Sequence, residues 1–145
     1  RKAILGGSAS DALAGGSYDL GPSIAAQIDT FVGVAGGNLG LVSCYYTGPS
    51  TPTCGSTNGL YPGQAWGWYV YGVSDFLDDI NSRTDALADH VYSLWSPDDQ
   101  VIGYGGLVWG SYTAQIPGQD GEIRLDDTLH FALRDSWAEQ LSLVQ

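Results

Sequence analysis

The sequence predicts an α/β domain with a mostly parallel sheet, because short β-branched and aromatic runs alternate with helical segments. Runs of this kind at 29–35 and 90–95 indicate the two clearest strands. Between them, residues 75–80 indicate a helix, with Ser74 as its N-cap and acidic residues near its amino end. No domain boundary is visible, so residues 1–145 are expected to form a single domain.

Shorter elements are expected on either side of this pattern. Residues 2–5 indicate the last turn of a helix that ends at Gly6. Residues 21–28 indicate a short helix with a proline near its first turn. A short strand is expected near Val108, and residues 122–125 indicate either another strand or an extended segment.

The final helix has the best-defined pattern. Ser136 and Glu139 have the spacing of a capping box at its start. Its apolar residues recur at helical spacing, namely Leu133, Trp137, Leu141 and Val144. By contrast, the run at 29–35 is expected to be a buried strand that ends in a tight glycine loop.

Composition excludes several classes of partner. The 145 residues carry 16 Asp and Glu against 5 Lys and Arg, a formal net charge of -11. Nucleic acids and anionic membranes require a surface rich in Lys and Arg, so neither is expected to bind. The hydrophobic fraction of 43% argues against disorder. Because the sequence contains no Met, it is expected to be a mature product, a cleaved piece or an excerpt.

The two cysteines favour a disulfide. Cys44 and Cys54 lie in a stretch rich in Gly, Pro, Ser and Thr, with no flanking His and no zinc-site spacing. A disulfide closing a surface loop is favoured over two buried thiols, and it would indicate an oxidising compartment, secreted or lumenal. No stretch approaches the length of a transmembrane segment.

Two histidines are available for acid–base chemistry. His90 opens a strand without polar neighbours in sequence, so a structural role is favoured for it. His130 lies in a loop before the final helix, where hydrolases with a Ser, Asp, His order carry their general base. A solvated loop histidine is an equally good interpretation of His130 taken alone.

An acidic pair follows the strand at 90–95. Asp98 and Asp99 lie at its carboxyl end, where ligands and catalytic groups gather in parallel sheets. Either carboxylate could accept the Nδ1 hydrogen of His130 and fix its tautomer. The alternative is a turn, because Ser-Pro-Asp-Asp is good turn chemistry by itself.

A nucleophile is missing from this pattern. No Gly-x-Ser-x-Gly motif is present, and the nearest matches, around Ser8 and Ser17, both lack the final glycine. Neither serine follows a predicted strand. There is also no calcium-binding loop and no phosphate-binding glycine motif, so no metal or cofactor is expected.

The aromatic run at 66–71 allows two interpretations. Trp66, Trp68, Tyr69 and Tyr71 could form an exposed lid or patch that touches lipid or a partner. The favoured alternative is a packed strand face, because aromatic residues at near-alternating spacing more often face a core.

Several stretches, taken together and in this order, resemble class 2 triacylglycerol lipases, which are secreted serine esterases of the α/β-hydrolase type. The matching stretches are RKAILGG (1–7), DTFVGVAGGN (29–38), SDFLDDIN (74–81), HVYSLWSPDD (90–99) and VWG through IPGQ (108–119). Each is moderately specific, and the likeness covers most of the chain.

The resemblance implies an α/β-hydrolase-type sheet flanked by helices. It implies that Asp99 is the triad acid, since the family places this residue shortly before an apolar pair, here Val101 and Ile102. It also implies that His130 is the triad base and that the two cysteines are bonded. The family's serine elbow stands upstream of the segment matching Arg1, so the chain is expected to be a partial domain, the C-terminal part of such a lipase.

Two functions are therefore expected as alternatives. The first is a secreted, cofactor-free carboxylic ester hydrolase acting on lipid esters, whose serine lies upstream and whose N-terminal part is a candidate partner chain. This chain alone would then be inactive. The second is a catalytically inactive, hydrolase-derived structural or binding module in an extracellular assembly.

Overall fold

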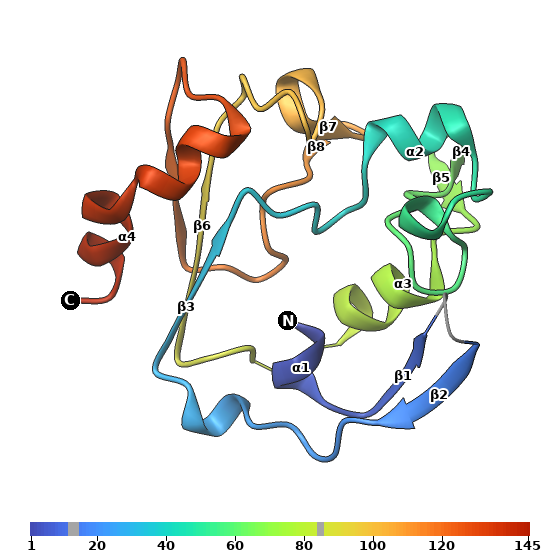
Figure 1. Cartoon of the computed structure of the whole chain (residues 1–145), viewed down its shortest axis with the longest axis horizontal. Helices are drawn as coiled ribbons and strands as arrows, with labels where there is room; N and C mark the ends of the chain where they lie inside the picture. The colour runs from blue at the N-terminus through green and yellow to red at the C-terminus, as the bar shows by residue number, and fades with distance from the viewer. Residues whose placement is uncertain (12–14, 84–85) are drawn as a thin grey trace.

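The computed structural model describes residues 1–11, 15–83 and 86–145. At its centre lies a three-stranded parallel sheet with the strand order β3-β6-β9 (Figure 1). Its strands are β3 (Thr30–Val34), β6 (His90–Trp95) and β9 (Gly121–Arg124). All three strands were expected from the sequence, within one or two residues at each end.

The remaining described strands form three antiparallel hairpins. They are β1 (Ser8–Asp11) with β2 (Gly16–Asp19), β4 (Gln64–Trp66) with β5 (Tyr69–Tyr71), and β7 (Leu107–Val108) with β8 (Ser111–Tyr112). The α/β prediction is thus confirmed for the central parallel sheet. The three antiparallel hairpins are separate from this sheet, and the described strands do not make up a full α/β-hydrolase sheet.

Four α-helices and four 3-10 turns complete the described chain. The helices are α1 (Lys2–Leu5), α2 (Val42–Thr47), α3 (Asp75–Ser82) and α4 (Trp137–Leu143). The 3-10 turns are η1 (Ala25–Gln27), η2 (Pro52–Cys54), η3 (Tyr104–Gly106) and η4 (His130–Asp135). None of these helices has the length and apolar run that crossing a membrane would need, as far as the described residues go.

Helix α3 begins where the sequence predicted. The Ser74 hydroxyl accepts a hydrogen bond from the Leu77 amide (3.3 Å) and donates one to the Gly59 carbonyl oxygen (2.7 Å). The helix buries Leu77 and Ile80 against the sheet. The core around them consists of Leu5, Leu87, Ala88, Val91 and Ile116, with Phe31 at its margin.

Three local predictions were wrong. The helix expected over 21–28 is reduced to η1, because Ser23 and Ile24 instead bond the Ile4 carbonyl oxygen at the end of α1. Strand β3 is only half-buried, since it is an outer strand of the described sheet. The Ser136 hydroxyl donates to the Leu133 carbonyl oxygen and makes no cap for α4.

The apolar stripe of the last helix is also largely unburied. Leu133 is fully buried, whereas Trp137 is 72% exposed and Leu141 and Val144 are about half-exposed. In Figure 1, α4 lies to one side of the sheet, whereas α1 and α3 lie on the other. The two layers that cover a parallel sheet are therefore both present, but the layer with α4 is thin.

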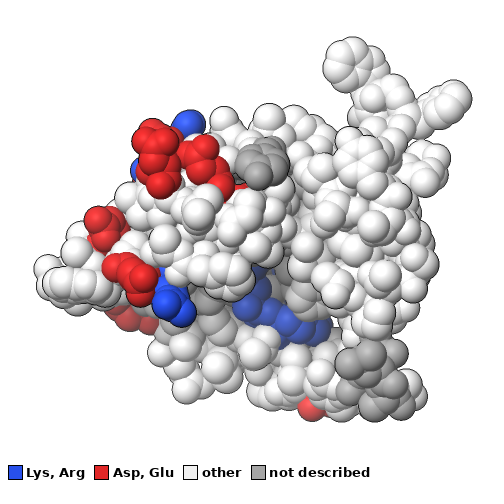
Figure 2. Space-filling view, turned by 45° about the horizontal axis from the view of Figure 1, so that its top comes forward, with Lys and Arg blue, Asp and Glu red and all other residues white. Residues whose placement is uncertain are grey.

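Charged side chains are distributed unevenly over the surface. In the view of Figure 2, acidic residues gather on one side of the molecule, whereas the part over α2 and the β4–β5 hairpin shows no Lys, Arg, Asp or Glu.

The disulfide is formed between Cys44, on α2, and Cys54, on η2, with a sequence separation of 10. Both sulfur-bearing residues are buried and pack against Tyr61. The bond therefore fastens a short helix to a loop that has little other secondary structure.

Replacing both cysteines by alanine is expected to lower the free energy of unfolding by about 2–3 kcal/mol, because an unfolded chain without this loop closure has more conformations. Urea unfolding of the variant against the oxidised wild-type chain measures the difference. A change below ~0.5 kcal/mol would show that the loop does not limit stability.

A cationic pair joins α1 to α3. The Lys2 ammonium lies 2.7 Å from an Asp79 carboxylate oxygen, and the Arg83 guanidinium lies 3.1 Å from the other. Arg83 also donates to the Leu5 carbonyl oxygen at 3.1 Å. Burial by itself raises the pKa of Asp79, but the hydrogen bonds from Lys2 and Arg83 outweigh it and hold that pKa below its ordinary value.

Because the folded-state pKa of Asp79 is lowered, its carboxylate stabilises the fold above pH ~4 and loses this effect as the pH falls through the folded-state value. We expect Asp79→Asn to cost about 0.5–1 kcal/mol at pH 7, a value kept small because the side chain is partly exposed. Denaturant unfolding at pH 7 and below pH ~3 would show this difference shrinking with acidity. Asp78→Asn, on the same helix and exposed, is the control and should cost less.

Candidate active site

The site lies at the carboxyl ends of β3 and β6. Strand β6 ends at Trp95, and Asp99 follows four residues later, in a turn. The Asp99 amide donates to the Ser96 carbonyl oxygen at 3.4 Å, and the Gly103 amide donates to the Asp99 carbonyl oxygen at 3.2 Å. The Asp99 side chain is therefore placed by a hydrogen-bonded turn, which the Ser-Pro-Asp-Asp sequence favours.

The two oxygens of the Asp99 carboxylate have different partners. Oδ1 accepts hydrogen bonds from the backbone amides of Val101 (2.9 Å) and Ile102 (3.0 Å). Oδ2 lies 2.7 Å from Nδ1 of His130. Since the residue is only 1% exposed, these contacts replace the water that a buried carboxylate loses.

His130 is the first residue of η4, in the segment that follows β9. Its backbone amide donates to Oε1 of Gln100 at 3.1 Å, and its ring meets Phe131 edge-on at 5.2 Å between centroids. A carboxylate accepts but does not donate, so Nδ1 carries the hydrogen and Nε2 is the nitrogen left with a free lone pair. Nε2 makes no hydrogen bond within the described residues.

Asp98 has a different place from its neighbour. Its Oδ2 accepts a hydrogen bond from the Asp127 amide at 2.8 Å and does not contact His130. Asp127 adopts a positive φ of 55°, which is unusual for a residue other than glycine. Asp98 thus holds the turn that carries the chain toward His130, whereas Asp99 holds the imidazole.

A shallow cavity of about 460 Å³ opens beside the imidazole. Its lining is mostly apolar, and no residue of it bears a hydroxyl or thiol; it consists of Val34, Ala35, His130, Phe131, Leu133, Arg134 and Gln140. Ala35 follows β3 and adopts a positive φ of 51°. The described residues therefore place the His130 imidazole at this cavity, with no hydroxyl or thiol among the lining side chains.

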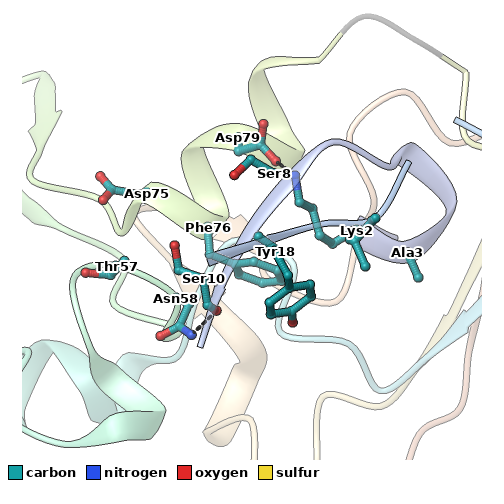
Figure 3. A pocket seen from close by; sticks show the side chains of 12 residues that line it. Lys2, Ala3, Ser8, Ser10, Tyr18, Thr57, Asn58, Asp75, Phe76 and Asp79 are labelled. Atoms are coloured by element: carbon teal, nitrogen blue, oxygen red, sulfur yellow. Dashed lines mark hydrogen bonds and ion pairs between the residues drawn. The ribbon is translucent and has the colours of Figure 1, made fainter. Parts of the chain in front are cut away.

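The serines nearest to an elbow motif lie elsewhere. Ser8 is on β1 and Ser17 on β2, so neither stands on a turn from a strand into a helix. Ser8 instead lines a second cavity of about 540 Å³ between the β1–β2 hairpin, α1 and α3. Figure 3 shows Lys2 bonded to Asp79 and Asn58 bonded to the Ser10 backbone in this cavity, which holds no histidine.

His90 lies at the amino end of β6, the end opposite to Asp99, where its ring stacks on Tyr92. Over residues 1–11, 15–83 and 86–145, no group of three His, Cys, Asp or Glu side chains has the geometry to hold a metal ion.

Three residues that hold the Asp99–His130 pair in place were not predicted from the sequence. Gln100 accepts the His130 amide, and the Val101 and Ile102 amides bind Asp99. The amide contacts could have been anticipated, because an Asp side chain commonly accepts from amides two and three residues further on. Nothing in the sequence pattern indicates the Gln100 contact, which joins segments 30 residues apart.

A buried Asp hydrogen-bonded to the Nδ1 of a loop His, at the carboxyl ends of a parallel sheet, is the geometry on which Ser-His-Asp hydrolases rely. A family model described as lipase (class 2) matches residues 1–142. The chain therefore belongs to the class 2 lipase family, which makes it lipase-like at the level of the family. Comparison with curated proteins and with solved structures gave no significant match.

Asp99→Ala is expected to release the His130 ring and to leave the Val101 and Ile102 amides without partners. Leaving a buried donor unpaired costs about 1–3 kcal/mol, so the variant should unfold more easily. NMR of the imidazole should show the deshielded Nδ1 proton of the wild type disappear. Asp98→Ala should retain that proton signal, and a retained signal in Asp99→Ala would contradict the described contact.

Proposed function

We propose that the protein is an ester hydrolase acting on lipid esters, in which His130 is the general base and Asp99 orients it. The single observation that carries this proposal is the 2.7 Å contact between His130 Nδ1 and Asp99 Oδ2. Membership of the class 2 lipase family supports the reaction class. The apolar lining of the adjoining cavity suits an uncharged acyl chain.

The proposed reaction follows from the two ring nitrogens. A serine hydroxyl attacks the ester carbonyl carbon as His130 Nε2 takes its proton, and the imidazolium then returns that proton to the departing alcohol. Water repeats the two steps on the acyl-serine and releases the acid. Throughout, the Nδ1 hydrogen stays on the ring and bonds to Asp99, which stabilises the imidazolium.

The nucleophile is proposed to lie outside these residues, on a segment upstream of Arg1, as the sequence resemblance implies. The described residues support this in one respect, because no hydroxyl lines the cavity beside His130. On this proposal the 145 residues are inactive by themselves, and their partners are a lipid ester and the segment bearing the serine.

The proposed setting is extracellular. The Cys44–Cys54 disulfide supports this, because disulfides persist in oxidising compartments and are rare in the cytosol. The acidic net charge of -11 is compatible with an uncharged ester but would disfavour an anionic lipid surface.

In the intact protein, Asp99→Asn is expected to lower kcat on a soluble ester by about 10,000-fold, because the amide favours the wrong tautomer of His130. Asp78→Asn, an exposed carboxylate on α3, is the matched control and should keep wild-type turnover. Labelling with a fluorophosphonate probe identifies the serine. Full turnover of Asp99→Asn would refute the role of Asp99, and absence of any labelled serine would favour a non-catalytic binding module.

A further inference from the structure

The β4–β5 hairpin carries an unusual group of exposed aromatic side chains. Trp68 is 100% exposed, and Trp66 and Tyr69 are each 78% exposed. Gly67 and Trp68 form its two-residue turn, and Gly67 has the positive φ, 62°, that the first turn position of such a hairpin requires. The packed strand face favoured from the sequence is therefore wrong, because these rings do not meet a core.

The strand register places the rings together. Trp66 is paired with Tyr69, and Gln64 with Tyr71, so all four side chains lie on one face of the hairpin. The Tyr71 hydroxyl donates to Gln64 Oε1 at 3.1 Å, which turns its ring across the strand pair. Trp68 lies in the turn at the tip of the hairpin and is fully exposed.

A second group of aromatic residues adjoins the hairpin. The rings of Tyr45 and Trp109 meet edge-on at 5.0 Å between centroids, and Tyr45 meets Tyr46 at 5.2 Å. Trp109 Nε1 donates to the Pro62 carbonyl oxygen at 2.8 Å, which ties this group to the segment entering β4. Together the two groups form what we call the aromatic surface: Tyr45, Tyr46, Trp66, Trp68, Tyr69, Tyr71, Leu107 and Trp109.

The aromatic surface is free of charge. Residues 30–74 and 100–119 supply all of it, and they contain no Asp, Glu, Lys, Arg or His. All 16 acidic and 5 basic residues come from the rest of the chain. Figure 2 shows the result as an uncoloured region over α2 and the hairpin, from which side chains project at the upper right.

We propose that the aromatic surface docks the protein onto an uncharged lipid surface. Trp and Tyr have apolar rings with one polar atom, and this composition suits the boundary between water and lipid. A charge-free face can contact a neutral or zwitterionic surface without removing water from a charged side chain, which would cost free energy. Anionic lipid would instead repel the net charge of -11, and the face has no Lys or Arg to offset it.

The shape of this surface favours lipid over a second copy of the chain. A stable protein interface needs a continuous face of about 800 Å² on each partner. Here both strands are exposed along their whole length, and Trp68 stands at the tip of a narrow hairpin. A single projecting ring enters a deformable lipid boundary more readily than it fills a fixed protein pocket.

The loops next to the aromatic surface are connected to the edge of the sheet where the candidate active site lies. The Asn38 amide, in the loop after β3, donates to the Thr113 carbonyl oxygen at 2.7 Å, so the loops that carry α2 and β7–β8 are joined at the carboxyl edge of the sheet. Asp99 lies at the same edge. This docking role rests on the proposed function, which supplies the choice of an ester lipid. It adds the face of the protein that would contact that lipid.

Flotation of the full chain with phosphatidylcholine vesicles containing triolein tests the proposal without needing turnover. The double variant Trp66→Ser, Trp68→Ser is expected to lower the lipid partition coefficient at least ~10-fold. Trp137→Ser, on α4 and 72% exposed, is the matched control and should float like the wild type. Trp68→Tyr should retain most of the binding, and thermal unfolding should be unchanged in all variants.

Salt and lipid charge give the second readout. Partition onto phosphatidylcholine should stay constant between about 0.05 and 0.5 M salt, whereas phosphatidylglycerol vesicles should bind less at low salt. Equal flotation of wild type and double variant would overturn the proposal. So would a wild type that fails to float but sediments as a dimer that the double substitution dissociates. Hydrolysis of a soluble ester by the intact protein is measured separately, so a failed enzyme assay leaves the docking result interpretable.

Discussion

Strand β6 is the element on which the rest of the described molecule depends. It pairs with β3 on one side and β9 on the other, buries Val91 against α3, and ends where the Asp99 turn begins. Because both neighbours are parallel to it, their carboxyl ends come to the same edge of the sheet. A disturbance of β6 would therefore shift Asp99, the His130 ring that it contacts and the cavity wall at the end of β3.

The distribution of charge follows from a second constraint. The net charge of -11 falls on a chain in which only 14% of residues are charged, so long stretches carry none. The structure gathers these stretches into one region, and the acids occupy the rest. Ion pairs such as Lys2–Asp79 fasten helices within the acidic part, whereas the region without charge is held by a disulfide and by hydrogen bonds to backbone oxygens.

Predictability from the sequence varies with the range of the interactions involved. Strand β6 and the start of α3 follow from local rules, namely a run of aromatic and aliphatic residues and a serine cap, and the structure has both. The loss of the helix expected over residues 21–28 could not be predicted. There the Ser23 hydroxyl bonds the Ile4 carbonyl oxygen, which only the tertiary fold brings near. The exposure of 66–71 was missed for the same reason, since an alternating pattern shows that one face is apolar but not whether a core lies against it.

The site shows the same division. Local turn chemistry and the resemblance to lipases singled out Asp99 and His130, and the structure brings the two side chains together, while their catalytic roles remain a proposal. Their contact spans 31 residues, so spacing alone could not distinguish Asp99 from Asp98. The distinction arises from backbone geometry: neighbouring carboxylates point to different partners, one to an imidazole and one to the Asp127 amide.

The position of the Asp99 carboxylate can be followed through two backbone amides. The carboxylate oxygen that does not face His130 is bonded by the amides of Val101 and Ile102. The exchange rates of those two amide hydrogens with solvent therefore measure how often the carboxylate leaves its position. Such a measurement reports the internal motion of the site in the unliganded chain, because it needs no substrate, inhibitor or nucleophile.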